Sequence, residues 1–280
     1  GAAMGARFGG AFRLGAAKYC AGGNLKYQQF LRPNDEARVH LKYDADKNKL
    51  TFKLENAGLD ILAFITPLVT QGSGGLNGSV KLTGTLAEPQ LTGNLSVHHG
   101  TIQFRDLKNP MENIEAAIVL DGTKATITSS GTMDKKGKKN KGSYLLNGMV
   151  YWKGWKIHSY QGSLELNKLG IDCDYFKGPL SGQLAIEEGH NFPLLKGNIE
   201  IADAMLNIPL IAINTGNSPD LEMDMTISLG KNVRLYNPVL YDLIVTGAAT
   251  FHGTVSHPIP SGQFEALRGS VRYLDTKFNV

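Results

Sequence analysis

The sequence is poor in cysteine and in charged residues, and each shortage excludes a class of protein. Only two cysteines, Cys20 and Cys173, occur in 280 residues. They are too few for a disulfide framework, and neither has a Cys or His neighbour at the spacing of zinc ligands. Charged residues make up 19% of the chain and hydrophobic residues 42%, a balance that excludes a highly charged disordered chain and a coiled coil.

Long apolar runs and catalytic motifs are also missing. The longest mainly apolar run, residues 61–69, is less than half of the roughly 20 residues that a membrane-spanning helix needs. No stretch matches G-x-S-x-G, a phosphate-binding loop or H-E-x-x-H. His98 and His99 are adjacent, so on a regular strand they would point to opposite faces and could not share a metal. We therefore expect no catalytic residue, no metal, no cofactor and no enzymatic activity.

The chain instead has 33 glycines and a frequent alternation of apolar and polar side chains. Residues 1–36 are expected to be a weakly ordered lead-in or first strands. Alternation over residues 37–44 and 50–55, with a turn between them, predicts a hairpin. Only residues 58–64 look helical, and Pro67 follows them. The sequence therefore predicts an all-β protein with at most one short helix, with residues 37–280 as one continuous repetitive β-domain.

An internal repeat is the strongest signal in the sequence. Three segments, near residues 76–104, 178–208 and 243–273, share the spacing Gly, ten residues, Pro, three residues, Gly. Each copy reads as strand, proline-bearing turn, strand, tight turn, strand. The paired glycines are Gly78 and Gly93, Gly182 and Gly197, and Gly247 and Gly262.

The repeated glycines fall on the same side of the alternation as the large apolar residues. A glycine in mid-strand removes side-chain bulk and allows a kink or bulge, so such glycines would bend a long sheet toward its apolar side. The result would be a long curled sheet, trough-like or closed into a barrel, with an apolar inner face. The side chains predicted to line that face are Leu82, Leu86, Leu95, Val97, Ile102, Phe104, Leu184, Ile199, Ile201, Leu206, Ile208, Met223, Met225, Ile227, Leu229, Phe251 and Phe264.

The segment 220–229 divides most clearly into two faces. Asp220, Glu222 and Asp224 alternate with apolar residues. Three carboxylates on alternate strand positions can be part of a metal site, but no His or fourth ligand accompanies them. We interpret them as part of a solvated outer face.

A resemblance to a known family is carried by three stretches. They are G-x-V-x-L-x-G-T-L-A-E-P-x-L-x-G-x-L-x-V-x-x-G-x-I at 78–102, ENIEAAIVLDGTKATI at 112–127, and the run from LEMDMTISL to RYLDTKFNV at 221–280. Together they resemble the C-terminal region of the TamB family, the translocation and assembly module subunits of diderm bacteria, within the wider AsmA-like group. The resemblance covers about residues 37–280, and its specificity comes from the order of degenerate motifs.

The resemblance implies a β-taco sheet with an apolar groove, in a protein anchored in the inner membrane and reaching across the periplasm. It implies phospholipid as cargo, a role in outer-membrane biogenesis, and an outer-membrane β-barrel partner of the Omp85 type. The family has no catalytic motif residue to carry over. Because the anchor is missing, the resemblance also implies that this sequence is a fragment of a longer chain.

Three functions fit these observations. The first is a periplasmic lipid conduit, in which the apolar faces of successive strands carry phospholipid acyl chains between the two membranes. The second is a periplasmic scaffold for outer-membrane protein (autotransporter) assembly, which would pair an exposed sheet edge with client strands. The third is a β-sandwich or barrel whose apolar residues pack only against one another. A net charge of +4 gives no reason to expect a nucleic-acid partner.

Overall fold

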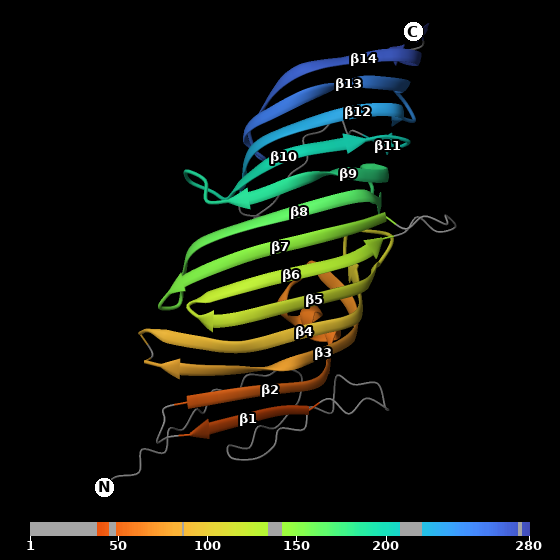
Figure 1. Ribbon diagram of the computed structural model, residues 1–280. Helices are drawn as coiled ribbons and strands as arrows, with labels where there is room; N and C mark the ends of the chain where they lie inside the picture. The colour runs from red at the N-terminus through yellow and green to blue at the C-terminus, as the bar shows by residue number, and fades with distance from the viewer. Residues whose placement is uncertain (1–37, 45–48, 86, 134–141, 208–219, 274–275) are drawn as a thin grey trace.

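All the described strands belong to one fifteen-stranded sheet in the computed structural model (Figure 1). The structure describes residues 38–44, 49–85, 87–133, 142–207, 220–273 and 276–280. The predicted lead-in and two of the predicted inner-face residues, Leu86 and Ile208, lie outside this part of the chain. The all-β, curled-sheet class predicted from the sequence is correct.

The strands are long for a globular protein, and many of them exceed the usual five or six residues. They are β1 (Arg38–Asp44), β2 (Lys49–Gly58), β3 (Val69–Gly84), β4 (Pro89–Phe104), β5 (Met111–Gly122), β6 (Lys124–Met133), β7 (Gly142–Lys153), β8 (Lys156–Asp172), β9 (Phe176–Glu187), β10 (Leu194–Ile201), β11 (Met205–Leu206), β12 (Glu222–Asn237), β13 (Tyr241–Thr254), β14 (Pro258–Tyr273) and β15 (Thr276–Asn279).

The strands follow one another in chain order with one change of direction. Each pairs antiparallel with the next, from β1 to β10 and from β12 to β15, but β10 and β12 are parallel. The short strand β11 pairs with both β9 and β12. A parallel neighbour requires a long connection, which here is residues 202–221 and includes β11. The predicted hairpin is confirmed as β1 and β2.

The predicted short helix is also confirmed. A 3-10 turn, η1 (Leu59–Ile61), continues into α1 (Leu62–Ile65), behind the sheet in the view of Figure 1. Leu59 is only 3% exposed. It lies against the same side of the sheet as Val97 and Ile114, since a Cβ on Gly100 would meet all three side chains.

Each repeat copy forms one hairpin: β3–β4, β9–β10 and β13–β14. The tight turn predicted after the second glycine is wrong for the first and third copies, because β4 and β14 continue unbroken past Gly100 and Gly269. Only in the second copy does the strand end, at Ile201.

The six repeat glycines share one unusual backbone geometry. Their φ angles run from 131° at Gly247 to 158° at Gly262, a region that residues with a Cβ rarely adopt. A Cβ at any of the six would lie 2.0–2.3 Å from a carbonyl oxygen of the neighbouring strand. Within the three hairpins, pairing is continuous through all six glycines. On their other side, Gly78, Gly182 and Gly247 are the last paired residues before register shifts with β2, β8 and β12. The glycines therefore act through backbone conformation and close strand approach, and three of them border a bulge in the neighbouring strand.

The bulged residues themselves lie at other positions, and together they form a line across the sheet. Register shifts bracket His99 in β4, Asn113 in β5, Lys168 in β8 and Asn232 in β12. All four residues have left-handed backbones with φ of 51–54°, and Asp203 beyond β10 also has one, with φ of 50°. A bulge adds one residue to a strand and increases its local bend and twist.

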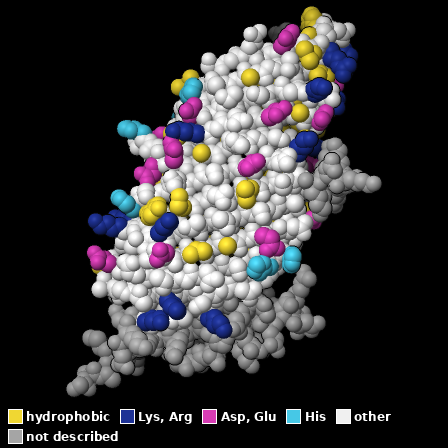
Figure 2. Space-filling model, in the orientation of Figure 1, with side chains coloured by type: hydrophobic (Ala, Val, Ile, Leu, Met, Phe, Trp, Pro, Cys, Tyr) yellow, Lys and Arg dark blue, Asp and Glu magenta, His cyan; other side chains and the backbone are white. Residues whose placement is uncertain are grey.

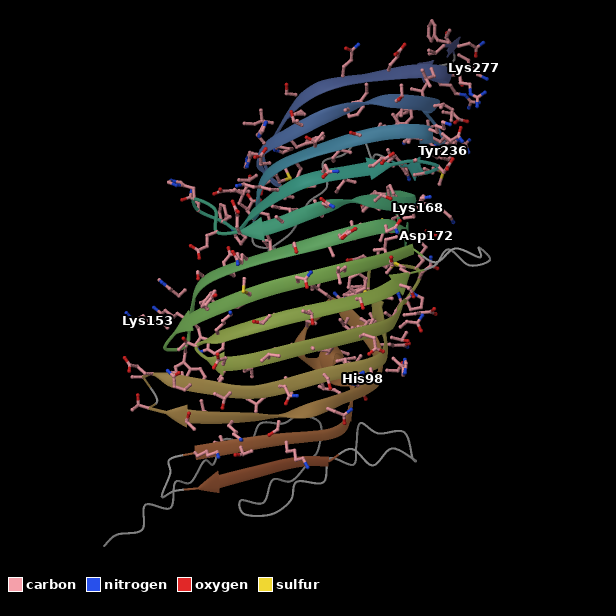
Figure 3. All side chains as sticks on the ribbon, viewed as in Figure 1. His98, Lys153, Lys168, Asp172, Tyr236 and Lys277 are labelled. Atoms are coloured by element: carbon pink, nitrogen blue, oxygen red, sulfur yellow. The ribbon has the colours of Figure 1, made fainter. Side chains whose placement is uncertain are left out.

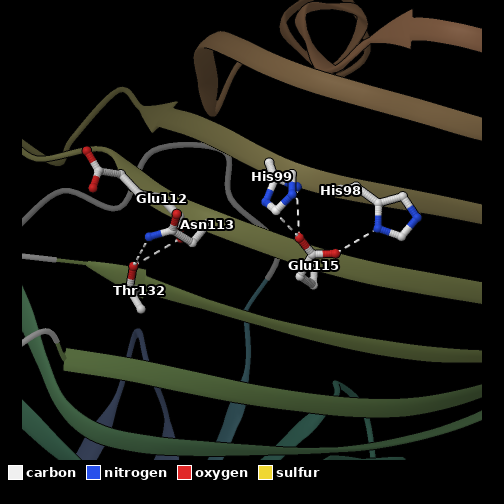
Figure 4. Close-up of polar contacts among 6 residues, drawn as sticks. All are labelled: His98, His99, Glu112, Asn113, Glu115 and Thr132. Atoms are coloured by element: carbon white, nitrogen blue, oxygen red, sulfur yellow. Dashed lines mark hydrogen bonds and ion pairs between the residues drawn. The ribbon is translucent and has the colours of Figure 1, made fainter.

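Side chains and neighbouring strands hold the bulges in place. The His99 N–H donates to Glu115 Oε1 at 2.9 Å, and Asn113 Nδ2 donates to Thr132 Oγ1 at 3.0 Å (Figure 4). Further along the sheet, Asn232 Nδ2 donates to Asp203 Oδ1 at 2.9 Å. All three bonds are solvent-exposed, and they tie the left-handed residues to neighbouring segments of the sheet.

Two of the carboxylates at the start of β12 have structural roles. Glu222 accepts backbone N–H bonds from His190, Asn191 and Phe192 in the β9–β10 turn. Asp220 accepts from the hydroxyl of Ser256 at 2.6 Å and from two backbone N–H groups. These bonds, led by that of Ser256, lower the pKa of Asp220 to about 2. Glu222 and Asp220 therefore tie neighbouring turns to the start of β12. The sequence-based interpretation of these carboxylates as part of a solvated outer face did not include this structural role.

Replacing Gly182 with Ala is expected to destabilise the protein by about 3 kcal/mol, because the added Cβ meets the Asn198 carbonyl and φ is positive. The matched control is Gly148→Ala, at a β7 position where a Cβ would find its nearest neighbour 3.6 Å away. Urea unfolding of both variants tests this, and equal stabilities would contradict the assigned role of the repeat glycines.

Asp220→Asn is expected to lower the unfolding free energy at neutral pH. Because the pKa of Asp220 falls from 3.8 to about 2 on folding, its stabilising contribution is complete above the unfolded value and is lost as the pH falls through the folded value. The difference between wild type and variant should therefore shrink between pH 4 and pH 2, as measured by chemical unfolding at several pH values. A difference independent of pH would rule out this contribution.

Candidate functional site

The strand registers place apolar residues in continuous rows across the sheet. Residues paired in adjacent strands share a face, so the pairings trace each row from strand to strand. One row, from β3 to β14, consists of Gly78, Leu95, Ile118, Ile127, Gly148, Gly162, Ile186, Leu195, Met223, Gly253 and Pro258. We call the side that carries this row the apolar face.

Two further rows lie on the same face. The first consists of Leu76, Val97, Ala116, Ser129, Leu146, Leu164, Leu184, Gly197, Met225, Phe251 and Pro260. The second consists of Gly131, Tyr144, Leu166, Gly182, Ile199, Ile227, Ala249 and Gly262. No charged residue occurs in the three rows. Their hydroxyl groups, on Ser129 and Tyr144, bond to each other at 2.9 Å.

The opposite side, which we call the polar face, has a different chemistry. The row beside the first one consists of Asn77, Ser96, Ala117, Thr128, Asn147, Ser163, Ala185, Lys196, Asp224, His252 and Ile259. In Figure 2 the visible surface is mostly uncharged polar side chains and backbone, with scattered charged and apolar groups. The sheet therefore has one face suited to water and one suited to hydrocarbon.

The curl of the sheet lies on the apolar side. Buried residues gather there in two clusters. One contains Met133, Tyr144, Leu166 and Leu169, and the other contains Ile201, Ala204, Leu229, Val233 and Val245. Met133 and Val233 are completely buried although the described strands form a single sheet. Both clusters lie beside the line of bulges, where the sheet bends, and connecting segments add to their cover: Leu107 of the β4–β5 connection packs on the first cluster, and Ala204 of the β10–β11 connection belongs to the second.

All the predicted lining residues that the structure describes lie on the apolar face. Beyond the three rows, Leu82 pairs with Leu91 and Ile102 with Met111, while Phe104 pairs with the buried Val69. A fourth row contains Ile201, Leu229 and Phe264, and Leu206 pairs with Leu235. The repeat glycines lie on this face as well.

The apolar face is only partly covered by the protein itself. Ile201, Met225 and Leu229 are buried, most other predicted lining residues are half-buried, and Phe264 is 48% exposed. The terminal strands β1 and β15 do not pair with each other. The described strands therefore form an open curled sheet, neither a closed barrel nor two packed sheets.

The sequence argument about the two histidines is wrong in its geometry. Because His99 occupies a bulge, His98 and His99 both reach Glu115, with Nδ1–carboxylate distances of 2.8 and 3.4 Å (Figure 4). The backbone N–H of His99 and the ring of His98 lower the pKa of Glu115. No group of ligands able to hold a metal ion occurs in the described part of the chain.

Comparison of the chain with protein-family models, with curated proteins and with solved structures found no match. Within the described ranges, no helix has the length and apolar character needed to cross a membrane.

Partial exposure of the apolar face can be tested by cysteine labelling. Ile186 is 36% exposed on this face, whereas Val233 is 0% exposed on the same face. In a background with Cys20 and Cys173 replaced by Ser, Ile186→Cys should react with a maleimide roughly tenfold faster or more than Val233→Cys, which reacts only on local opening. Equally slow labelling at both positions would mean that the apolar face is covered.

Proposed function

We propose that the chain is a bridge-like lipid-transfer segment whose apolar face carries phospholipid acyl chains. The observation that carries the proposal is the set of three rows, which run from strand to strand without a charged residue. A protein that only needed a core would gain nothing from leaving much of such a surface half-exposed. Large apolar surfaces that remain open generally mark a binding site.

The energetics of lipid transfer explain why continuity matters. Burial of a methylene group is worth about 0.8 kcal/mol, so a two-chain lipid with roughly 30 methylenes needs on the order of 20 kcal/mol to enter water. A groove as apolar as the bilayer removes most of that barrier without binding the lipid tightly. A single charge within the path would restore a barrier of several kcal/mol, and the rows contain none.

The side chains on the path suit a mobile ligand. Leu, Ile and Val provide smooth aliphatic walls, while Met223 and Met225 on β12 can adapt to irregular chains. The glycines in the rows lower the floor of the groove between these side chains. The polar face would meanwhile keep the strands solvated.

The cellular setting is proposed from the family resemblance. The chain would act in the periplasm of a diderm bacterium as part of an inner-membrane-anchored protein. Its cargo would be phospholipid moving between inner and outer membranes in support of outer-membrane biogenesis. A β-barrel of the Omp85 type would be its outer-membrane partner.

A scaffold for outer-membrane protein assembly is the second candidate. The observation that favours it is the edge of β14, where β15 pairs only with Ser270–Tyr273. Among the described residues, the rest of that edge has no neighbouring strand, and exposed edges accept client strands. Pro258 and Pro260 lack N–H groups, which leaves only the later part of the edge suited to pairing. Lipid transfer uses far more of the molecule and is the function we favour.

Charge placed on the apolar face should abolish lipid loading. Leu95→Arg and Met225→Arg are expected to reduce co-purifying phospholipid roughly tenfold or more, because a charge in an apolar path is strongly unfavourable. Native mass spectrometry and lipid extraction of the purified variants measure this. Circular dichroism checks that the β-content is retained, which matters most for Met225 because it is only 7% exposed.

Matched controls place the same charge on the other face. Ser96→Arg and Thr226→Arg alter the adjacent residues of β4 and β12, which face the polar side. Both should load lipid as the wild type does. Normal loading by folded Leu95→Arg would contradict the groove assignment, and equal loss in all four variants would attribute the effect to charge itself.

A further inference from the structure

The corner of the sheet formed by β12, β14 and β15 combines positive charge with exposed apolar side chains. The basic residues of the described chain from residue 230 onward are Lys231, Arg234, Arg268, Arg272 and Lys277, whereas the acidic residues are Asp242 and Glu265. In Figure 2 a group of Lys and Arg side chains lies at the upper right, with apolar and some acidic side chains beside them, where Figure 1 places the C-terminal strands. Asp203 also lies here, since its N–H donates to the Lys231 carbonyl and its carboxylate accepts from Asn232. With five basic and three acidic side chains among the described residues, the corner has a net positive charge.

Most of this positive charge is available to a partner. Arg234 is neutralised by Asp242 through two bonds of 2.7 and 2.8 Å, and its guanidinium stacks on Tyr236. Lys231, Arg268 and Arg272 form no ion pair within the part of the chain that the structure describes. Arg268 pairs in register with Ile244, which pairs with Arg234, so both arginines lie on the polar face.

A surface hollow lies between two of these free cations. Lys231 and Arg268 line a cavity of about 530 Å³, together with Asn232, Ile244, Thr246 and Leu267. The cavity lies beside two irregularities of the sheet: the bulge at Asn232 in β12, and the register shift between Ile244 and Val245 of β13 in their pairing with β14. Two cations beside a hydroxyl and an apolar wall suit a phosphate group that carries an apolar substituent.

Exposed apolar side chains surround the basic group. Leu267, Phe278 and Val280 are 57%, 55% and 59% exposed, and Val239 in the β12–β13 turn is 68% exposed. The turn lies against β14, since the Arg272 N–H donates to the Leu240 carbonyl. Cations interspersed with exposed apolar groups are characteristic of proteins that bind anionic membrane surfaces.

We propose that this corner docks on an anionic phospholipid surface, with a head-group phosphate between Lys231 and Arg268 and with Leu267, Phe278 and Val280 entering the interface. The proposal rests on the proposed lipid-transfer function for its purpose: docking would bring the last strands of the apolar face to the membrane. Phe264 and Phe278 lie on that face, paired with Gly247 and Val271.

Vesicle co-sedimentation tests the docking. The wild type should bind phosphatidylcholine vesicles that contain phosphatidylglycerol and should bind pure phosphatidylcholine vesicles weakly. Replacing Lys231, Arg268 and Arg272 with Ala is expected to weaken binding about a hundredfold, at about fivefold for each cation near the surface. Binding of the wild type should also fall as salt is raised.

The control removes the same charge from elsewhere. Lys81, Arg105 and Lys108 are exposed and belong to β3 and the β4–β5 connection, whereas Figure 3 places Lys277 at the C-terminal end of the sheet. Replacing these three with Ala should leave vesicle binding nearly unchanged. Equal weakening in both triple variants, or no dependence on phosphatidylglycerol, would overturn the proposal. Displacement of the wild type from vesicles by free glycerol phosphate would also overturn it, since it would indicate a site for a soluble phosphate ester.

Failure of docking and failure of lipid transfer are distinguishable. The Lys231, Arg268 and Arg272 variant should still take up a short-chain phospholipid from solution, as measured by native mass spectrometry, while Leu95→Arg should dock on vesicles without taking up lipid. Loss of both properties in both variants would show that the two sites are not separate. Leu267→Ser should weaken docking alone, and unchanged docking would contradict the role of that side chain.

Discussion

Close approach of neighbouring strands at the repeat glycines is the constraint on which the rest of the structure depends. At Gly93 and Gly197 the adjacent carbonyl oxygen occupies the space that a Cβ would need, at 2.0 and 2.1 Å. Only glycine permits this backbone position with positive φ. Because the same geometry recurs in three hairpins on the same face, the sheet can curl repeatedly in one direction and keep its apolar side inside.

The bulges divide the curled sheet into regions with different degrees of cover. Beside them lie the two buried clusters, where Met133 and Val233 are fully enclosed. Away from them the apolar face is more open, as at Ile186. The bend at the bulges and the more open part of the apolar face together form a groove, and the shape of that groove is fixed by backbone geometry. Such a groove needs no filling side chains to keep it open, and this supports the proposed function.

Much of the fold could be predicted from the sequence, because its information is local and periodic. Alternation assigns each strand residue to one of two faces, and the face assignment of residues such as Leu95 and Met225 follows directly. The glycine repeat predicted curvature by kink or bulge. Pairing within each hairpin is continuous, and the bulges beside Gly78 and Gly182 belong to the neighbouring strands β2 and β8. Alternation could not assign the extra residue to a particular strand because it contains no information on φ.

Other features depended on contacts that the sequence does not encode locally. His99, Asn113, Asp203 and Asn232 are residue types enriched in the left-handed backbone, so a signal for those positions was present, but Lys168 gave none. The parallel pairing of β10 with β12 joins strands that are separated by residues 202–221 in the sequence, and no local motif specifies it. The basic corner assembles Lys231 and Arg268 from strands separated by β13, and only the three-dimensional register brings them together.

The most direct test of the central claim is crosslinking from the protein wall to its cargo. A photoreactive amino acid placed singly at Leu95, Leu184 or Met223 lies on the apolar face of β4, β9 or β12, and placed at Ser96, Ala185 or Asp224 it lies on the polar face. After illumination of lipid-loaded protein, mass spectrometry identifies the adducts. The account predicts phospholipid adducts at all three apolar-face positions and none at the polar-face positions. Adducts on neither face, or on both faces alike, would contradict it.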